Sequence, residues 1–219
     1  VEDGALQKDI DQLGWSGKIL NPQCIQSGKN CVINHILPVD ANLGVNKANF
    51  FVDKLMKLSS HIGKDGTISN EFSVAFTNNS SIGIKPGGTY TNYFQVYLPV
   101  DAQIKSVDID GTDVFDYTVS KSGVFKIASY LLKIPPSQTQ IFTVTYELNQ
   151  KFHQGENVYQ VVLQKQIGAF NSDFSLNITY DPSILLVDQN FKSVAKNHSV
   201  LYNSSLSTNK VFVTEFIKQ

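Results

Sequence analysis

The sequence has 219 residues, of which 42% are hydrophobic and 17% charged, and a formal net charge of −1. This hydrophobic fraction can form a core, which excludes a disordered chain, and the balanced charge excludes a strong attraction to nucleic acid or to an anionic membrane. All eighteen basic residues are lysines, and arginine, the side chain best suited to binding phosphates, is absent.

The first twenty residues begin with a helical pattern. Leu6, Ile10 and Leu13 recur at the spacing of one helix face, so a short N-terminal helix is expected. Residues 21–38 are expected to be irregular. Val1 is not a natural start, so we expect a piece of a longer protein, with any membrane anchor in the missing N-terminal part. No apolar run approaches the roughly 18–20 residues that span a bilayer, so this fragment itself should not contact a membrane.

Two cysteines lie in the irregular segment. Cys24 and Cys31 flank six residues, IQSGKN, and this spacing in a polar loop predicts a small disulfide, with two free thiols as the alternative. A disulfide implies an oxidising, extracytoplasmic location. Metal binding by the pair is disfavoured because only His35 lies nearby and four convergent ligands are missing.

The next motif is polar. Asp40, Asn42, Asn46 and Lys47 lie in DANLGVNK, which is expected to form a loop ordered by its own side chains. Two sharper interpretations remain open. The loop could be a binding site, or Lys47 could form an isopeptide cross-link with an asparagine, assisted by a buried acid.

Strands are predicted from Phe50 onwards because apolar and polar residues alternate. In the central strand, which follows the turn Pro86-Gly87-Gly88, Tyr93 and Tyr97 share one face. They are candidates for a glycan-stacking platform, while core packing or cross-strand pairing is the alternative. The predicted strands cover residues 50–58, 67–77, 90–98, 104–109, 114–119, 124–132, 138–148, 157–166, 174–180, 184–187, 191–195, 199–202 and 210–217.

One acidic run lies between two of these strands. Asp108, Asp110 and Asp113 in VDIDGTD are typical of a solvated hairpin turn. The same oxygen-rich spacing makes them candidate ligands for calcium, although the glutamate of an EF-hand is missing. Calcium is therefore the one cofactor that we consider.

These elements predict an all-β fold, mainly an antiparallel β-sandwich of about a dozen strands, with a short N-terminal helical segment. Residues 1–49 are expected to form a helix and disulfide-loop segment that packs on the body. Residues 50–148 and 149–219 are expected to form a first and a second β-sandwich portion, with one continuous domain as the alternative.

Four stretches carry a resemblance to a known family: QLGWSGKIL, VDANLGVNKANFFV, KPGGTYTNYFQVYLP and VVLQKQIG. They resemble the C-terminal β part of a bacterial family known as domain of unknown function 4012, and they extend from Gln12 to Gly168. The family usually has arginine at the position of Gln95 and proline at that of Ile167. The resemblance implies an envelope-associated protein and no established activity.

We single out no catalytic residue. The four histidines, His35, His61, His153 and His198, are expected in or beside loops, and no nucleophile elbow is present. The sequence favours a non-enzymatic, extracytoplasmic structural or adhesive module on a bacterial cell surface, whose partner is a cell-surface protein or a glycan. The alternatives are an accessory or substrate-binding domain of an envelope enzyme and a glycan-binding module.

Overall fold

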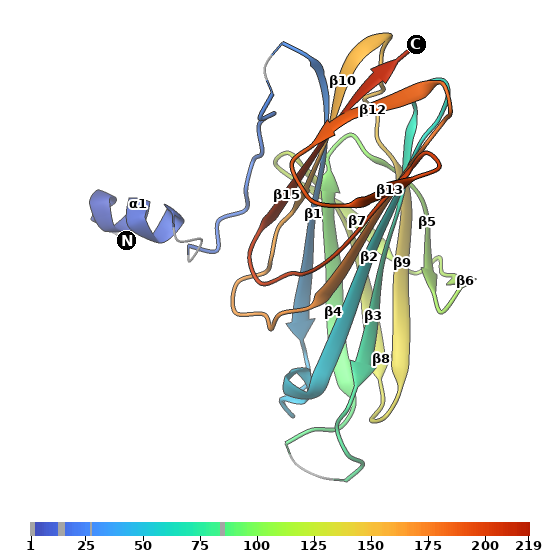
Figure 1. Ribbon diagram of the computed structural model, residues 1–219. Coiled ribbons are helices and arrows are strands. Elements are labelled where there is room, and N and C mark those ends of the chain that lie inside the picture. The colour runs from blue at the N-terminus through green and yellow to red at the C-terminus, as the bar shows by residue number, and fades with distance from the viewer. Residues whose placement is uncertain (1–2, 13–15, 27, 84–85) are drawn as a thin grey trace.

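Two β-sheets packed face to face form the body of the protein in the computed structural model (Figure 1). The structure describes residues 3–12, 16–26, 28–83 and 86–219. Within these ranges one α-helix, α1 (Gly4–Gln12), precedes the strands, and a 3-10 turn, η1 (Ala48–Phe51), leads into one of them. The predicted all-β fold with a short N-terminal helix is therefore confirmed.

The first sheet, called the β1 sheet, has seven strands among the described residues. In spatial order they are β12 (Ile184–Gln189), β15 (Lys210–Lys218), β10 (Gly155–Leu163), β1 (Asn30–Asn42), β4 (Tyr90–Pro99), β8 (Phe125–Ile134) and β7 (Thr118–Ser122). The second, called the β2 sheet, has eight. They are β13 (Val194–Lys196), β14 (Ser199–Ser205), β11 (Asp173–Tyr180), β2 (Val52–Ile62), β3 (Ile68–Asn78), β9 (Thr139–Glu147), β5 (Gln103–Ile109) and β6 (Thr112–Asp113).

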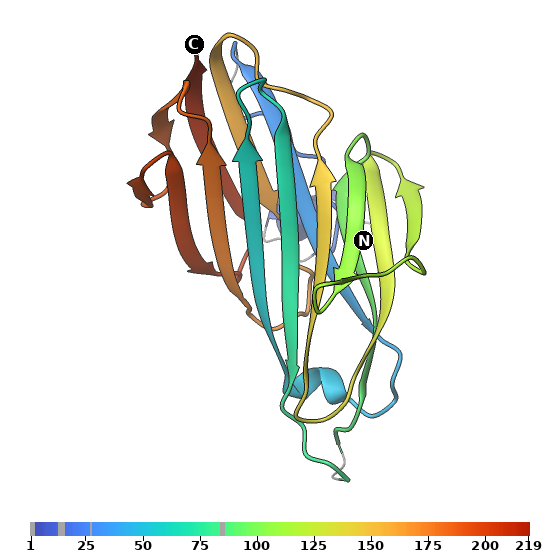
Figure 2. The same cartoon turned by 90° about the vertical axis from the view of Figure 1, so that its right-hand side faces the viewer.

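Pairing is mainly antiparallel, but one parallel pair lies inside each sheet. β1 pairs in parallel with β10, and β2 pairs in parallel with β11. Both pairs join strands from distant parts of the sequence. Residues 149–219 thus contribute three strands to each sheet, and Figure 2 shows them continuing the same two layers.

The core lies between the two sheets. Phe94, Val96 and Leu98 of β4 point into it, which confirms the predicted alternation of this strand. The ring of Phe94 meets those of Phe76 and Phe142 on the opposite sheet edge to face, at centroid distances of 5.0 and 5.1 Å. Such pairs stabilise the contact by about 1 kcal/mol beyond the area that they bury.

The hairpin between β2 and β3 turns at Lys64-Asp65-Gly66, which lies between the strands predicted over residues 50–58 and 67–77. Gly66 has φ +87°, and a Cβ atom there would collide with the backbone of Phe152. Asp65 accepts hydrogen bonds from the Thr67 amide and hydroxyl, which lower its pKa to about 2. Local turn chemistry therefore fixes this hairpin.

The expectation of an irregular segment over residues 21–38 was wrong for its second half. Asn30–Asn42 form β1, which lies inside its sheet between β10 and β4. Residues 34–38 of this strand are all buried, because both faces of β1 are covered. A strand covered on both faces shows a continuous apolar run rather than alternation, so the period-two signal was missing.

A segment called the strap, residues 16–26, joins α1 to β1 and runs along the outer face of the β1 sheet (Figure 1). Helix α1 stands away from the sandwich in the same view, and most of its described side chains are exposed. No helix in the described part of the chain is long and apolar enough to cross a membrane.

Candidate functional site

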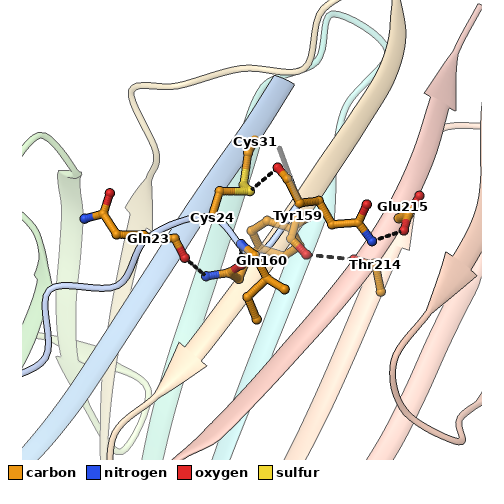
Figure 3. Close-up of a disulfide and its surroundings, with 9 residues drawn as sticks. Gln23, Cys24, Cys31, Tyr159, Gln160, Thr214 and Glu215 are labelled. Carbon is orange, nitrogen blue, oxygen red and sulfur yellow. Dashed lines mark hydrogen bonds between the residues drawn. A yellow bond between two sulfur atoms is a disulfide. The ribbon is translucent and has the colours of Figure 1, made fainter. Parts of the chain in front are cut away.

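The predicted disulfide is formed. Cys24 in the strap and Cys31 at the start of β1 are joined by an S–S bond, with a Cα–Cα distance of 6.3 Å (Figure 3). The bond closes the bend between the strap and the strand. A disulfide of this kind is typical of proteins from oxidising compartments.

Gln160 of β10 and Gln164, which directly follows β10, hold the strap by its backbone. The Gln160 side chain accepts a hydrogen bond from the Ile25 amide (2.9 Å) and donates one to the Gln23 carbonyl (2.9 Å), the second of which is drawn in Figure 3. Gln164 in the same way accepts from the Leu20 amide (3.0 Å) and donates to the Lys18 carbonyl (2.9 Å).

Each side-chain amide therefore gives the strap backbone the two hydrogen bonds that it would otherwise make with a neighbouring strand. Gln160 and Gln164 are only 1% and 6% exposed, because the strap covers them. Such buried amides stabilise the fold only while both their donor and their acceptor are satisfied.

A charge pair lies under the same end of the strap. Glu215 of β15 is mostly buried and accepts hydrogen bonds from Gln26 and from the Lys29 ammonium. The hydrogen bond from Lys29 to Glu215 raises the pKa of that lysine. The carboxylate thus anchors the turn between the two cysteines.

His35 lies inside β1 and not in a loop, which corrects the sequence expectation. Its side chain points to the outer face, where its Nε2 lies 3.2 Å from Gln164 Oε1 and its ring lies 4.9 Å from that of Phe125. The Leu20 amide already fixes that oxygen as an acceptor, so Nε2 carries the proton and Nδ1 is an acceptor. Burial lowers the pKa of His35 to about 4, which keeps the ring neutral.

A pocket of about 200 Å³ adjoins His35. Its other lining residues include Phe125, Asn149 and Asp101. Within the described part of the chain, His35 Nδ1 meets no hydrogen-bonding atom. A small ligand or a water molecule that donates a hydrogen bond would satisfy His35 Nδ1.

The polar motif begins in the last residues of β1, so the expected loop starts only after Asn42, and the motif is split between two roles. Asp40 contributes to what we call the Asp40 cluster, which consists of Asp40, Lys54, Asn92 and Gln166. The Asp40 carboxylate accepts hydrogen bonds from the Lys54 ammonium on one oxygen and from the Asn92 amide on the other (3.0 Å). The Gln166 side-chain amide accepts a hydrogen bond from the Asp40 backbone N–H (2.8 Å) and donates one to the Asp40 carbonyl (2.9 Å).

The other motif residues order the loop itself, in agreement with the first interpretation of the sequence. Asn42 accepts from the Gly44 amide, and Asn46 accepts from the Ala48 amide and donates to the Thr89 carbonyl. Lys47 is exposed and has φ 54°. A surface lysine does not fit a cross-link that needs a buried acid.

The Asp40 cluster joins stretches that are far apart in the sequence. The side chains come from β1, β2, β4 and the segment after β10, and a pocket of about 190 Å³ opens beside them. Three of the four stretches that carry the family resemblance meet here, and the fourth reaches Gln164 through Lys18 and Leu20. Leu13, Gly14, Trp15 and Lys85 of those stretches lie outside the described residues.

Tyr93 and Tyr97 lie half-buried on the outer face of β4, as the alternation predicted. The Tyr93 hydroxyl is 3.3 Å from that of Thr118 on β7, and this hydrogen bond lowers the Tyr93 pKa. The Tyr97 ring lies 6.2 Å from that of Phe125 on β8. Both tyrosines thus make cross-strand contacts, and Tyr97 also lines a groove of about 640 Å³ beside the strap.

The three aspartates of the acidic run lie at the β5–β6 hairpin. Asp108 accepts from the Gly111 amide, and Asp110, with φ 53°, accepts from the Ile141 amide at 2.8 Å. Asp113 is paired with Asp108 in the strand register. Within the described residues, no group of three His, Cys, Asp or Glu side chains is placed to hold a metal ion. Calcium binding stays a prediction.

A neutral polar network in the core was not foreseen. It joins Asn34 and Tyr159 of the β1 sheet to Ser60, Asn70 and Tyr146 of the β2 sheet. Asn34 donates to Asn70 (3.1 Å) and accepts from the Tyr146 hydroxyl (2.9 Å), and Tyr159 and Ser60 both bond to Asn70 at 2.8 Å. All five side chains are at most 2% exposed.

The sequence did contain a signal for the two glutamines that hold the strap and for the core network. Gln160 and Gln164 are polar, four residues apart and separated by two valines and a leucine, so alternation puts them on one face of an extended segment. Asn34 likewise interrupts the apolar run of β1. A polar residue inside such a run indicates a specific buried partner, but it does not identify that partner.

Neither a family model nor a curated protein matches the sequence. Among solved structures, the fold is similar to a candidate nutrient-binding protein from Legionella pneumophila, with 8% identity and a TM-score of 0.50 over 85% of this chain and 70% of that chain. Two weaker matches are native leukotriene A4 hydrolase from Saccharomyces cerevisiae (9% identity, TM-score 0.47, 80% of this chain, 30% of that chain) and an M1 zinc metallopeptidase from Deinococcus radiodurans (7%, 0.38, 75%, 42%). At these identities the first likeness shows a shared fold and nothing about activity.

Proposed function

We propose that this chain is a non-catalytic, extracytoplasmic β-sandwich module of a bacterial cell-envelope protein, with a structural or adhesive role. The single observation that carries the proposal is the disulfide-closed strap. Cys24–Cys31, Gln160, Gln164 and Glu215 together fix the segment before β1 to the sheet. An oxidised bond at this position supports export, and a fixed segment supports a role in holding or presenting other parts of a protein.

The proposal also agrees with the distribution of polar groups. Many of the buried ones form the neutral core network and the strap contacts, where their hydrogen bonds are used for structure. The resemblance to domain of unknown function 4012 adds the envelope setting. It remains part of the proposal.

The test is to produce the chain in a bacterium with and without an export leader, and to measure thiol content and hydrogen exchange. The exported chain should contain no free thiol, and its Leu20 and Ile25 amides should be protected. The reduced, cytosolic chain should lose protection at both amides. Equal protection in the two forms would show that the disulfide has no part in holding the strap, and would remove the main support for the proposal.

A glycan-binding role is the second candidate, and the groove beside the strap supports it. Leu37, Val39 and Tyr97 give it an apolar wall, and Gln166 adds a polar amide. Aromatic rings stack on the apolar faces of sugars. Titration with soluble cell-wall oligosaccharides should show binding that Tyr97→Ala abolishes. Tyr130→Ala, at a tyrosine of β8 that does not line the groove, should leave the binding unchanged. No binding would remove this candidate.

A further inference from the structure

The Asp40 cluster contains the three groups needed to form an amide between side chains. Lys54 supplies an amine, Asn92 a carboxamide, and Asp40 a carboxylate that hydrogen-bonds to both of them. Asp40 and Lys54 have side-chain exposures of 16% and 11%, and Asn92 is fully buried.

The surroundings favour this reaction over hydrolysis. Tyr90, 2% exposed, and Val52, 9% exposed, line the same pocket as Asp40 and Lys54. Burial and the Asp40 carboxylate raise the pKa of Tyr90, so its hydroxyl stays neutral beside that carboxylate. A site that these apolar side chains shield from water disfavours hydrolysis of the carboxamide.

The carboxamide is also polarised. The Asn92 side-chain oxygen accepts a hydrogen bond from the Ala41 backbone amide at 3.0 Å. A backbone N–H at this place stabilises the negative charge that develops on the oxygen when a nucleophile attacks the carbon. The Asn92 nitrogen, which would have to leave, donates to Asp40 and can therefore take a proton from it.

We propose that Lys54 and Asn92 form an intramolecular isopeptide bond, with Asp40 as the proton-transfer group. This inference goes beyond the proposed function, because it needs neither export nor an oxidant. The Lys54 ammonium gives one proton to Asp40, and the neutral Nζ attacks Asn92 Cγ. A new C–N bond forms, Asp40 passes its proton to the departing Nδ2, ammonia leaves as the old C–N bond breaks, and the Asp40 carboxylate takes the second Nζ proton. Asp40 then returns its proton to the ammonia or to solvent.

The bond would join the two sheets. Lys54 belongs to β2 and Asn92 to β4, whose sheets face each other, while Asp40 lies near the end of β1. Cys31 lies at the start of β1, so the cross-link and the disulfide would lie at opposite ends of the same strand. The rotatable chain of Lys54 allows Nζ to move from the carboxylate to the neighbouring carboxamide carbon.

The experiment is an intact-mass measurement on the purified 219-residue chain after reduction and denaturation. The expected mass is lower by one ammonia, about 17 Da, because an amine nucleophile replaces the amide nitrogen. Lys54→Arg and Asp40→Asn should restore the full mass. Lys47→Arg is the matched control, because Lys47 lies at the surface seven residues earlier, and it should keep the deficit.

Peptide mapping must then give one linked peptide that contains Lys54 and Asn92. A deficit that disappears after mild alkaline treatment without a linked peptide would show a cyclised asparagine and overturn the proposal. The full mass in the unsubstituted chain would overturn it as well. A loss of about 18 Da, one water, would show that Asp40 is the group that reacts and would overturn the role of Asn92. A deficit that persists in Lys54→Arg would exclude Lys54.

Discussion

The two faces of the β1–β10 strand pair are both buried, but by different means. On the inner face, Asn34 and Tyr159 belong to a neutral network that the opposite sheet covers. On the outer face, His35, Gln160 and Gln164 are covered by the strap. The inner cover is a whole sheet, whereas the outer cover is a single segment held by one disulfide and a few hydrogen bonds.

This difference decides how each face can be opened. The inner network becomes exposed only when the sandwich unfolds, because its members belong to central strands of both sheets. The outer face can open locally, since release of the strap leaves both sheets intact. The inner face is therefore suited to stability and the outer face to a function that needs access.

The largest effect is expected from breaking the inner network. Asn34→Ala removes the group that accepts from the buried Tyr146 hydroxyl and leaves a cavity, so the free energy of unfolding should fall by about 4 kcal/mol. Urea denaturation measures this. Asn203→Ala, an exposed asparagine of β14, is the control and should change stability by less than about 0.5 kcal/mol. A similar small change for Asn34 would contradict the importance of the network.

Acid should weaken the outer face first. The pKa of His35 is about 4 in the folded chain and 6.5 in an unfolded one, so below pH 6.5 the unfolded state binds more protons. Its contribution is complete above pH 6.5 and is lost as the pH falls to 4, for a total of about 3 kcal/mol. Denaturation at several pH values measures this slope. His61→Gln, at an exposed histidine, should keep it, and His35→Phe should reduce it.

Reduction of the disulfide should have a smaller and more local effect. A loop of this length closes with a stabilisation of about 2 kcal/mol, so Cys24→Ala with Cys31→Ala should lower the free energy of unfolding by that amount. Hydrogen exchange should increase at Leu20 and Ile25 and stay slow in β10. If exchange increased equally in β10, the two faces would not open independently.

The smallest effect is expected from one glutamine. Gln164→Ala removes two hydrogen bonds to the strap, at Lys18 and Leu20, together with the acceptor of the His35 Nε2 hydrogen bond, and should cost about 1 kcal/mol. Exchange should rise at Leu20 while Ile25, held by Gln160, stays protected. Gln154→Ala, at an exposed position, is the matched control. Loss of protection at both amides would mean that the strap is released as one unit.

Much of the sandwich followed from local patterns. The alternation over residues 90–98 put Phe94, Val96 and Leu98 on one face, which the structure turns to the core, and the Lys64-Asp65-Gly66 sequence is typical of the hairpin turn that it forms. The cysteine spacing predicted the disulfide. The motif at Asp40 was recognised as an ordered loop, with a binding site or a cross-link through Lys47 as the alternatives. Lys54, which contacts Asp40, appeared in the sequence only as a polar position of a strand.

The sequence by itself determined the all-β class, the faces of the strands, the disulfide and the place of the polar motif. These depend on residues close together in the chain, whose period and turn chemistry act locally. Only the tertiary structure decided that β1 lies between β10 and β4, that Gln160 and Gln164 hold the strap, and that Asp40 meets Lys54 and Asn92. Those contacts join residues separated by up to 146 positions, and they are set by which strands pair and which faces are covered, neither of which a local pattern specifies.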